Sequence, residues 1–345
     1  MQCSRTWQAI ANAWDYSAAI RPRMLRHAPA LALLMCIGPT ASATDDTDAL
    51  PDETVGEDVG LHRETPAPPT VAAELGIGTM PDEIAKAARD SRHLPIAERM
   101  ARISDTMLGR PYQSDPLGEG FGHDPDPLVR YDVFDCLTFV EEVVALSLAG
   151  DPAHAGEVRL GLRYGTSAPD YATRHHFMEL QWIPSAIEQG WLKDTTKEYG
   201  DTIHMEREVT ADTWKRWPAR HRFALTDEQL PTGTMQLDVL ELDTAIAAVD
   251  QIRPGTIVLT VRADRAYKPI WISHVGFVVP ADKPTVRHAT RMASKTVRDH
   301  GLEWYLKHLK TYSKWRAVGV ALLEPIEQGP RVVSSDPTAA GALPR

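Results

Sequence analysis

One cysteine lies where a nucleophile would be expected. Cys136 directly follows Asp135, at the first turn of a segment with helical spacing. Unpaired N–H groups and the dipole at the N-terminus of a helix stabilise a thiolate, which is the nucleophilic form of cysteine. The alternative role is that of a small buried hydrophobic residue, but a core cysteine has no reason to lie beside a helix cap. We therefore predict that Cys136 is a nucleophile with a lowered pKa.

A thiol nucleophile needs a base, and two of the 13 histidines lie in segments that fit this role. His274 lies in the alternating apolar run 270–279, on the same strand face as Gly276, and His288 lies in the run 286–290. If His288 pairs opposite Gly276, the two histidines share one face and the glycine leaves room for their rings. A shift of one residue would put the histidines on opposite faces, so the register decides whether they form a pair.

A helix over residues 135–148 is predicted to carry Cys136. Asp135 is a suitable N-cap and Gly150 a suitable C-terminal stop. Apolar residues recur at helical spacing, and further apolar residues lie on the other faces, so the helix must be largely buried.

The histidines belong to a predicted antiparallel meander. The runs 255–261, 270–279 and 286–290 are rich in β-branched residues, alternate in polarity and are separated by turn residues. Residues 81–108 have helical spacing, and residues 118–127 form a loop rich in glycine, proline and aspartate. We predict an α+β fold in which the helix bearing the nucleophile packs on an antiparallel sheet.

The 345 residues predict one domain with flanking segments. Residues 44–70 have the composition of a disordered linker, residues 71–325 are continuously patterned as a single catalytic domain, and residues 326–345 resemble a disordered tail. With 43% apolar and 24% charged residues, the composition is that of a globular protein. The net charge of −10 argues against nucleic acid as a partner.

Residues 1–43 predict export from the cell. Basic residues between Arg21 and His27 precede a short apolar run at 30–37, and an Ala-x-Ala motif ends at Ala43. This pattern is typical of an N-terminal extension and a secretory signal peptide cleaved after Ala43. It predicts a periplasmic or secreted protein, translated from Met24, with no stable membrane span after signal removal. A lipoprotein anchored at Cys36 is the weaker alternative, because a bulky residue precedes that cysteine.

Cleavage of the leader would leave Cys136 as the one remaining cysteine in a compartment that oxidises thiols. No intramolecular disulfide is then possible. A thiol kept there is either buried and inert or required for chemistry.

The motifs that contain these residues resemble those of a known family. It is the NlpC-type, papain-like group of cysteine peptidases and amidases of bacterial cell walls, in its N-acetylmuramoyl-L-alanine amidase-like branch. The matching motifs occur in the same order over about residues 100–320: Leu108-Gly109-Arg110-Pro111-Tyr112, Asp135-Cys136-Leu137-Thr138-Phe139-Val140-Glu141, Ser273-His274-Val275-Gly276-Phe277-Val278 and His288-Ala289-Thr290.

The resemblance implies that Cys136 is the nucleophile, His274 the general base and acid, and His288 the residue that orients His274. Tyr112 matches a tyrosine near the nucleophile, and the backbone N–H of Cys136 would contribute to the oxyanion hole. The resemblance also implies a papain-like core, no cofactor or metal, and a peptidoglycan or muropeptide substrate cleaved through a thioester. The bond cleaved is either the lactyl amide between muramic acid and L-Ala or the bond between D-Glu and the diamino acid. The chain departs from compact members in its long insertion at 113–134.

Three further residues match that branch and are weaker candidates for substrate binding. Arg174, His176 and Trp182 would suit a peptide carboxylate and an amino sugar. The alternative is a solvated loop beside a core tryptophan.

Two other functions remain open. One is a catalytically inactive cell-wall-binding module on the same fold. The other is a metal-dependent hydrolase that uses some of His175, His176, His274 and His288 with an aspartate, although no H-E-x-x-H or paired-cysteine spacing is present.

Overall fold

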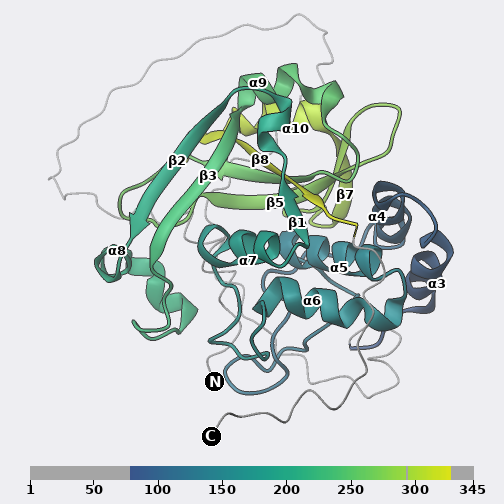
Figure 1. Ribbon diagram of the computed structural model, residues 1–345, viewed down its shortest axis with the longest axis horizontal. Helices are drawn as coiled ribbons and strands as arrows, with labels where there is room; N and C mark the ends of the chain where they lie inside the picture. The colour runs from purple at the N-terminus through teal and green to yellow at the C-terminus, as the bar shows by residue number, and fades with distance from the viewer. Residues whose placement is uncertain (1–77, 293, 328–345) are drawn as a thin grey trace, which may run out of the picture.

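The computed structural model describes residues 78–292 and 294–327. The predicted leader, the linker and residues 328–345 of the tail lie outside these residues. The described chain has an α+β fold, in which one antiparallel sheet separates two groups of helices (Figure 1). The α-helices are α3 (Asp82–Ser91), α4 (Ile96–Asp105), α5 (Cys136–Ala149), α6 (Ala155–Tyr164), α7 (Ile183–Glu188), α8 (Ala211–Arg216), α9 (Leu242–Ala247) and α10 (Leu302–Leu309).

The sheet has eight strands in the order β2-β3-β8-β4-β5-β6-β7, with β1 paired to β8, and every pairing is antiparallel. The strands are β1 (Leu192–Asp194), β2 (Thr202–Val209), β3 (Gly233–Glu241), β4 (Ile257–Arg262), β5 (Ile272–Val279), β6 (Thr285–Ala289), β7 (Val297–Gly301) and β8 (Ala317–Pro325). The predicted meander is confirmed as β4-β5-β6 at the middle of this sheet. Five short helical segments complete the fold: η1 (Pro152–His154), η2 (Met178–Trp182), η3 (Thr196–Tyr199), η4 (Pro218–Phe223) and η5 (Val249–Gln251).

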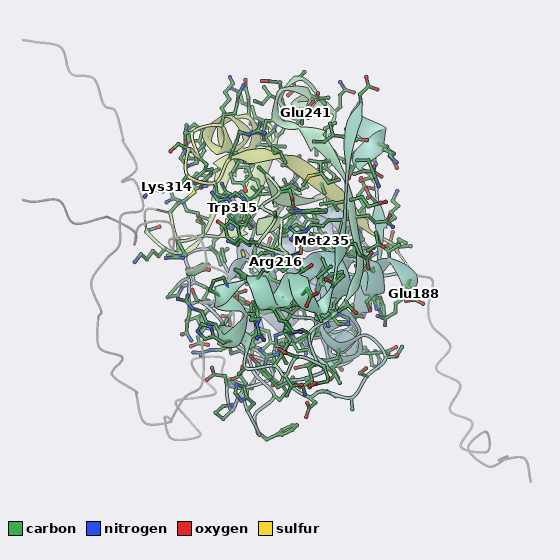
Figure 2. All side chains as sticks on the ribbon, turned by 90° about the vertical axis from the view of Figure 1, so that its left-hand side faces the viewer. Glu188, Arg216, Met235, Glu241, Lys314 and Trp315 are labelled. Atoms are coloured by element: carbon green, nitrogen blue, oxygen red, sulfur yellow. The ribbon has the colours of Figure 1, made fainter. Side chains whose placement is uncertain are left out.

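Both faces of the sheet are buried, so its central strands carry apolar side chains on both faces. Ile257 and Leu259 of β4 belong to the core that contains α5, whereas Val258 belongs to the core that contains α9 and α10. Figure 1 shows α5, α6 and α7 on one side of the sheet and α9 and α10 on the other. Side chains from both layers fill the space around the ribbon (Figure 2).

Helix α5 forms as its sequence predicts. The side chain of Asp135 accepts a hydrogen bond from the N–H of Thr138 at 2.8 Å, and the hydroxyl of Thr138 accepts one from the N–H of Asp135, so the two residues form a capping box. Gly150 ends the helix in the left-handed conformation, with φ 66°. Nearly every side chain between these caps is buried.

The helical region predicted over 81–108 is two helices, α3 and α4. Pro95 interrupts it, since proline has no N–H to donate within a helix and restricts the residue before it. Pro95 then acts as the N-cap residue of α4. The break lets the buried sides of α3 and α4 pack on each other as well as on the common core.

Candidate active site

Cys136 is the first residue of α5 and lines a cavity of about 90 Å³. Its side chain is partly buried. The cavity lies between the N-terminus of α5, strands β4 and β5, and α10. The side chains with polar groups along its wall are Tyr112, Asp135, Thr260, Arg262, Ser273, His274, Thr290, Arg291, Tyr305 and Tyr312.

The structure brings the two predicted histidines together. Nε2 of His274 on β5 lies 2.7 Å from Nδ1 of His288 on β6, and the two rings are nearly perpendicular. The strands pair Phe277 with Arg287 and Val278 with Val286, and the same register extended by one residue puts Gly276 opposite His288. The short distance from Gly276 to His288 agrees with this, so the predicted register is confirmed. His288 is fully buried behind His274, whereas His274 is partly exposed to the cavity.

Gly276 is required by this close approach. A Cβ atom at this position would lie 2.9 Å from the Cβ atom of His288 and 2.9 Å from the carbonyl oxygen of Arg287. Ordinary carbon contacts are about 3.5–4.0 Å, so no larger residue fits without moving β6.

The thiol of Cys136 does not have the lowered pKa that its place at a helix N-terminus predicts. Burial, and to a lesser extent the neighbouring carboxylate of Asp135, raise its pKa to about 12. The N–H groups of Val275, Leu137 and Cys136 itself act in the opposite direction but are outweighed. The prediction of a lowered pKa for Cys136 is therefore wrong.

The imidazole of His274 is held in its neutral form. Burial lowers its pKa to about 3, and the positive charge of Arg262 and the ring of His300 act in the same direction. A neutral thiol and a neutral imidazole therefore face the cavity at neutral pH. A reaction at this site has to move the thiol proton as the sulfur attacks.

Tyr112 lines the same cavity as Cys136 despite the insertion that separates them in the sequence. Tyr112 is bridged to Phe134, and the N–H of Gln113 donates to the carbonyl of Phe134 at 3.0 Å. The two ends of the insertion, at Gln113 and Phe134, therefore lie side by side. Because of this, the length of the insertion does not move Tyr112 away from Cys136. Burial and then Cys136 raise the pKa of the Tyr112 phenol, so it is a neutral hydroxyl at this wall.

The structure does not bring Arg174, His176 and Trp182 to the cavity. Each is at least 96% buried and forms contacts inside the protein. The guanidinium of Arg174 donates to Glu119 and Asp124, and His176 Nε2 lies 2.6 Å from the carbonyl oxygen of Tyr171. These contacts assign them structural roles, and the binding role predicted for them has no support from their positions.

Arg174 fixes the insertion. Glu119 and Asp124 both lie in it, as does Asp115, whose carboxylate is 3.7 Å from the same guanidinium. The predicted loop at 118–127 contains no helix or strand, as expected. The buried ion pairs of Arg174 with Glu119 and Asp124 hold this loop against the domain. Trp182 is held in a similar way, because its indole N–H donates to the buried carboxylate of Glu141 at 2.9 Å.

Two positioning residues were not predicted from the sequence. The carboxylate of Glu179 accepts hydrogen bonds from the N–H groups of Trp271 and Ile272, two residues before His274. Arg262 donates to the hydroxyl of Ser273 at 2.8 Å and to the carbonyl of Trp315, a residue labelled in Figure 2. A buried carboxylate and a buried guanidinium thus hold the two ends of the segment that leads into His274.

Among residues 78–292 and 294–327, no group of three or more His, Cys, Asp or Glu side chains has an arrangement that could hold a metal ion. Of the histidines in the metal-hydrolase alternative, His175 has its Nδ1 3.0 Å from the carbonyl oxygen of Leu162, so it is occupied by the main chain like His176. In the same part of the chain, no helix has the length and apolar character needed to cross a membrane.

A family model described as AmiA-like, N-acetylmuramoyl-L-alanine amidase-like, matches residues 102–312, which is well over half of the chain. No sequence of a curated protein matches significantly. Among solved structures, a protein from Legionella pneumophila is 21% identical, with a TM-score of 0.61 over 70% of this chain and 93% of that one. An N-acetylmuramoyl-L-alanine amidase from Bacteroides uniformis is 20% identical, with a TM-score of 0.53 over 67% of this chain and 98% of that one. At these identities the structural likeness shows a shared fold.

Proposed function

Since the chain belongs to the N-acetylmuramoyl-L-alanine amidase-like family, we propose that it is a cysteine amidase that cleaves an amide bond of bacterial peptidoglycan. The observation that carries this proposal is the His274–His288 pair, 2.7 Å apart, at the wall of the cavity into which Cys136 opens. A papain-like core requires a helix with a cysteine at its N-terminus, packed on antiparallel strands that carry the histidine. The arrangement of α5, β5 and β6 supports such a core.

The proposed reaction starts from the neutral pair. As the sulfur of Cys136 attacks the amide carbon, its proton passes to Nδ1 of His274, and Nε2–H of His274 donates to His288. The C–N bond then breaks, His274 returns the proton to the leaving amine, and a thioester remains on Cys136. Water deprotonated by His274 attacks this thioester, and the thiol is released with its proton.

Backbone N–H groups at the start of α5 and on β5 support the charged steps. The N–H groups of Cys136, Leu137 and Val275 are directed toward the sulfur, and they stabilise negative charge there. The helix N-terminus supplies the same stabilisation to the oxygen of the tetrahedral intermediate. Tyr112, with its neutral hydroxyl on the wall, is proposed to position the substrate carbonyl.

The cavity wall suits an anionic peptide. Arg262 and the exposed Arg291 contribute positive charge, and Thr260, Ser273 and Thr290 contribute hydroxyl groups. In a peptidoglycan stem, D-Glu carries a free carboxylate next to its bond to the diamino acid and one residue away from the lactyl amide. We also propose that the protein acts outside the cytoplasm, on the basis of the leader sequence, in which case N-terminal sequencing of the exported protein gives Thr44 first.

The test is a digest of purified peptidoglycan and of soluble muropeptides, analysed by mass spectrometry, with the wild type, Cys136→Ala and Cys136→Ser. The wild type is expected to release a free amine from one stem bond, and both variants are expected to release none while keeping the wild-type melting curve. Activity that persists in EDTA and disappears after thiol alkylation supports the cysteine mechanism.

Two outcomes would overturn the proposal. Binding of peptidoglycan without any cleavage by the wild type would indicate the inactive wall-binding module. Cleavage that persists in Cys136→Ala and stops with EDTA would indicate a metal-dependent hydrolase.

A further inference from the structure

A third histidine continues the pair at the candidate active site. Nε2 of His288 lies 2.8 Å from Nδ1 of His300 on β7, and the two rings are almost perpendicular. His274, His288 and His300 thus form one chain of hydrogen bonds across three neighbouring strands, linked each time from Nε2 of one ring to Nδ1 of the next. His274 faces the cavity, His288 is fully buried, and His300 is partly exposed.

The directions of these hydrogen bonds are coupled, because a neutral imidazole has one N–H and one acceptor nitrogen. To take a proton from Cys136 at Nδ1, His274 must carry its own proton on Nε2 and donate it to Nδ1 of His288. His288 then carries its proton on Nε2 and needs an acceptor. Nδ1 of His300 is the acceptor that the structure offers.

The opposite direction would disable the base. If His300 carried its proton on Nδ1, it would donate to His288, which would in turn donate to Nε2 of His274. The proton of His274 would then be on Nδ1, where it cannot accept another from the thiol. The tautomer of His300 therefore selects between a competent and an incompetent His274.

We propose that His300 is a positioning residue for this reaction, which fixes the tautomers of His288 and His274 by accepting a hydrogen bond from His288. This inference rests on the proposed function, because it presumes that His274 is the base. It also explains why a buried histidine can serve as the third residue of the triad: without an acceptor, the Nε2–H of fully buried His288 would be unpaired, which is costly.

The surroundings of His300 keep it neutral and fixed in place. Its ring stacks on Trp304 of α10 at 4.8 Å, and the ring of His308 also stacks on that indole at 5.1 Å. Burial lowers the pKa of His300 to about 4, and Arg298 and His308 contribute in the same direction, while Asp299 opposes them. A protonated His300 would have two donors and could not accept from His288, so its neutral form is the one the relay needs.

The experiment compares His300→Phe, which keeps an aromatic ring but has no acceptor, with His300→Asn, whose side-chain oxygen can take the place of Nδ1. His308→Phe is the matched control, since it changes the same ring stack without touching the hydrogen-bonded chain. We expect kcat on muropeptides to fall about ten- to hundred-fold in His300→Phe with little change in KM, the range that is found when hydrogen-bond partners of metal-ligating histidines are removed. His300→Asn should recover most of this loss, and His308→Phe should resemble the wild type.

A second readout does not depend on activity. Nitrogen-15 chemical shifts of the imidazole rings report which nitrogen of His274 and His288 carries the proton. His300→Phe should convert His274 from the Nε2–H form to a mixture of tautomers, and His300→Asn should restore the single form. If His300→Phe does not fold, His300→Leu replaces it, because it too has no hydrogen-bond acceptor for His288.

The outcomes separate the two proposals. If the wild type cleaves peptidoglycan and His300→Phe cleaves it with the same kcat, the role of His300 is refuted while the proposed function stands. If the wild type cleaves nothing but the tautomers respond to His300→Phe, the proposed function fails and the hydrogen-bonded chain remains. Tautomers that do not change in His300→Phe refute the inference in either case.

Discussion

Replacing Gly276 by alanine should separate His274 from His288 without changing any polar group. The added Cβ atom would lie 2.9 Å from the Cβ atom of His288 and 3.1 Å from a methyl group of Val286. Ordinary carbon contacts start at about 3.5 Å, so β6 must move by about half an ångström. The 2.7 Å distance between Nε2 of His274 and Nδ1 of His288 would then increase to about 3.2 Å, the long end of the usual hydrogen-bond range of about 2.7–3.2 Å.

The expected cost follows from these two effects. Overpacking of a close contact costs about 1–3 kcal/mol, and the weakened hydrogen bond about 0.5–1.5 kcal/mol, so the free energy of unfolding should fall by about 1.5–4.5 kcal/mol. In a domain of this size, this corresponds to a decrease in Tm of roughly 3–18 °C. Misplacement of the base by this distance should lower kcat about ten-fold or more.

The assay combines thermal melting, followed by circular dichroism, with muropeptide cleavage measured over a range of substrate concentrations. The control is Gly156→Ala in α6, where the one atom near the added Cβ is Nη1 of Arg159 at 3.9 Å. That variant should be stabilised by about 0.5–1 kcal/mol, because alanine favours the helix, and should keep full activity. A Gly276→Ala protein that melts and cleaves like the wild type would refute the close approach of the two strands as the reason for this glycine.

Three further predictions concern burial and charge. Arg174→Leu should lower the free energy of unfolding in urea by about 3–5 kcal/mol, because buried carboxylates of the insertion lose their cation; a loss under about 1 kcal/mol would contradict this role. Burial raises the pKa of Cys136 to about 12, so its alkylation by iodoacetamide should be slow at pH 6 and accelerate above pH 8. A plateau of fast reaction near pH 6 would contradict this and indicate a thiolate–imidazolium pair with His274. Burial lowers the pKa of His176 to about 3 from about 6.5 in the unfolded chain, so its neutral form contributes stability above pH 6.5 that is lost as the pH falls toward 3. Between pH 6 and pH 4 the unfolding free energy of His176→Gln should therefore depend on pH less steeply than that of the wild type, by up to about 1.4 kcal/mol per pH unit, and equal slopes would contradict this assignment.

Much of the candidate site follows from local sequence. The capping box at Asp135 and Thr138 and the stop at Gly150 are encoded within 16 residues, and they fix where Cys136 lies on α5. The register of β5 and β6 follows from the alternation of apolar residues and from a short turn, so the pairing of His274 with His288 was predictable as well. These features need information only from neighbours along the chain.

Other strands of the sheet gave no comparable signal. β7 has one fully buried residue, Val297, in five positions, and its exposed edge carries charged residues, so its alternation is too weak to predict a strand. His300 consequently had no predicted place near His288, although it lies 12 residues further along the chain. Its location depends on the antiparallel pairing of β7 with β6.

The sequence by itself determined the type of site: a cysteine at a helix N-terminus, two histidines on neighbouring strands that share one face of the sheet, and a glycine that lets them approach. Only the tertiary structure decided how these groups are solvated and what holds them. It buried Arg174 against carboxylates of the insertion instead of exposing it to a substrate, and it raised the pKa of Cys136 where the helix terminus predicted a decrease. The physical reason is that helix caps and strand alternation depend on residues close in sequence, whereas desolvation and ion pairing depend on atoms contributed by segments 50 or more residues away.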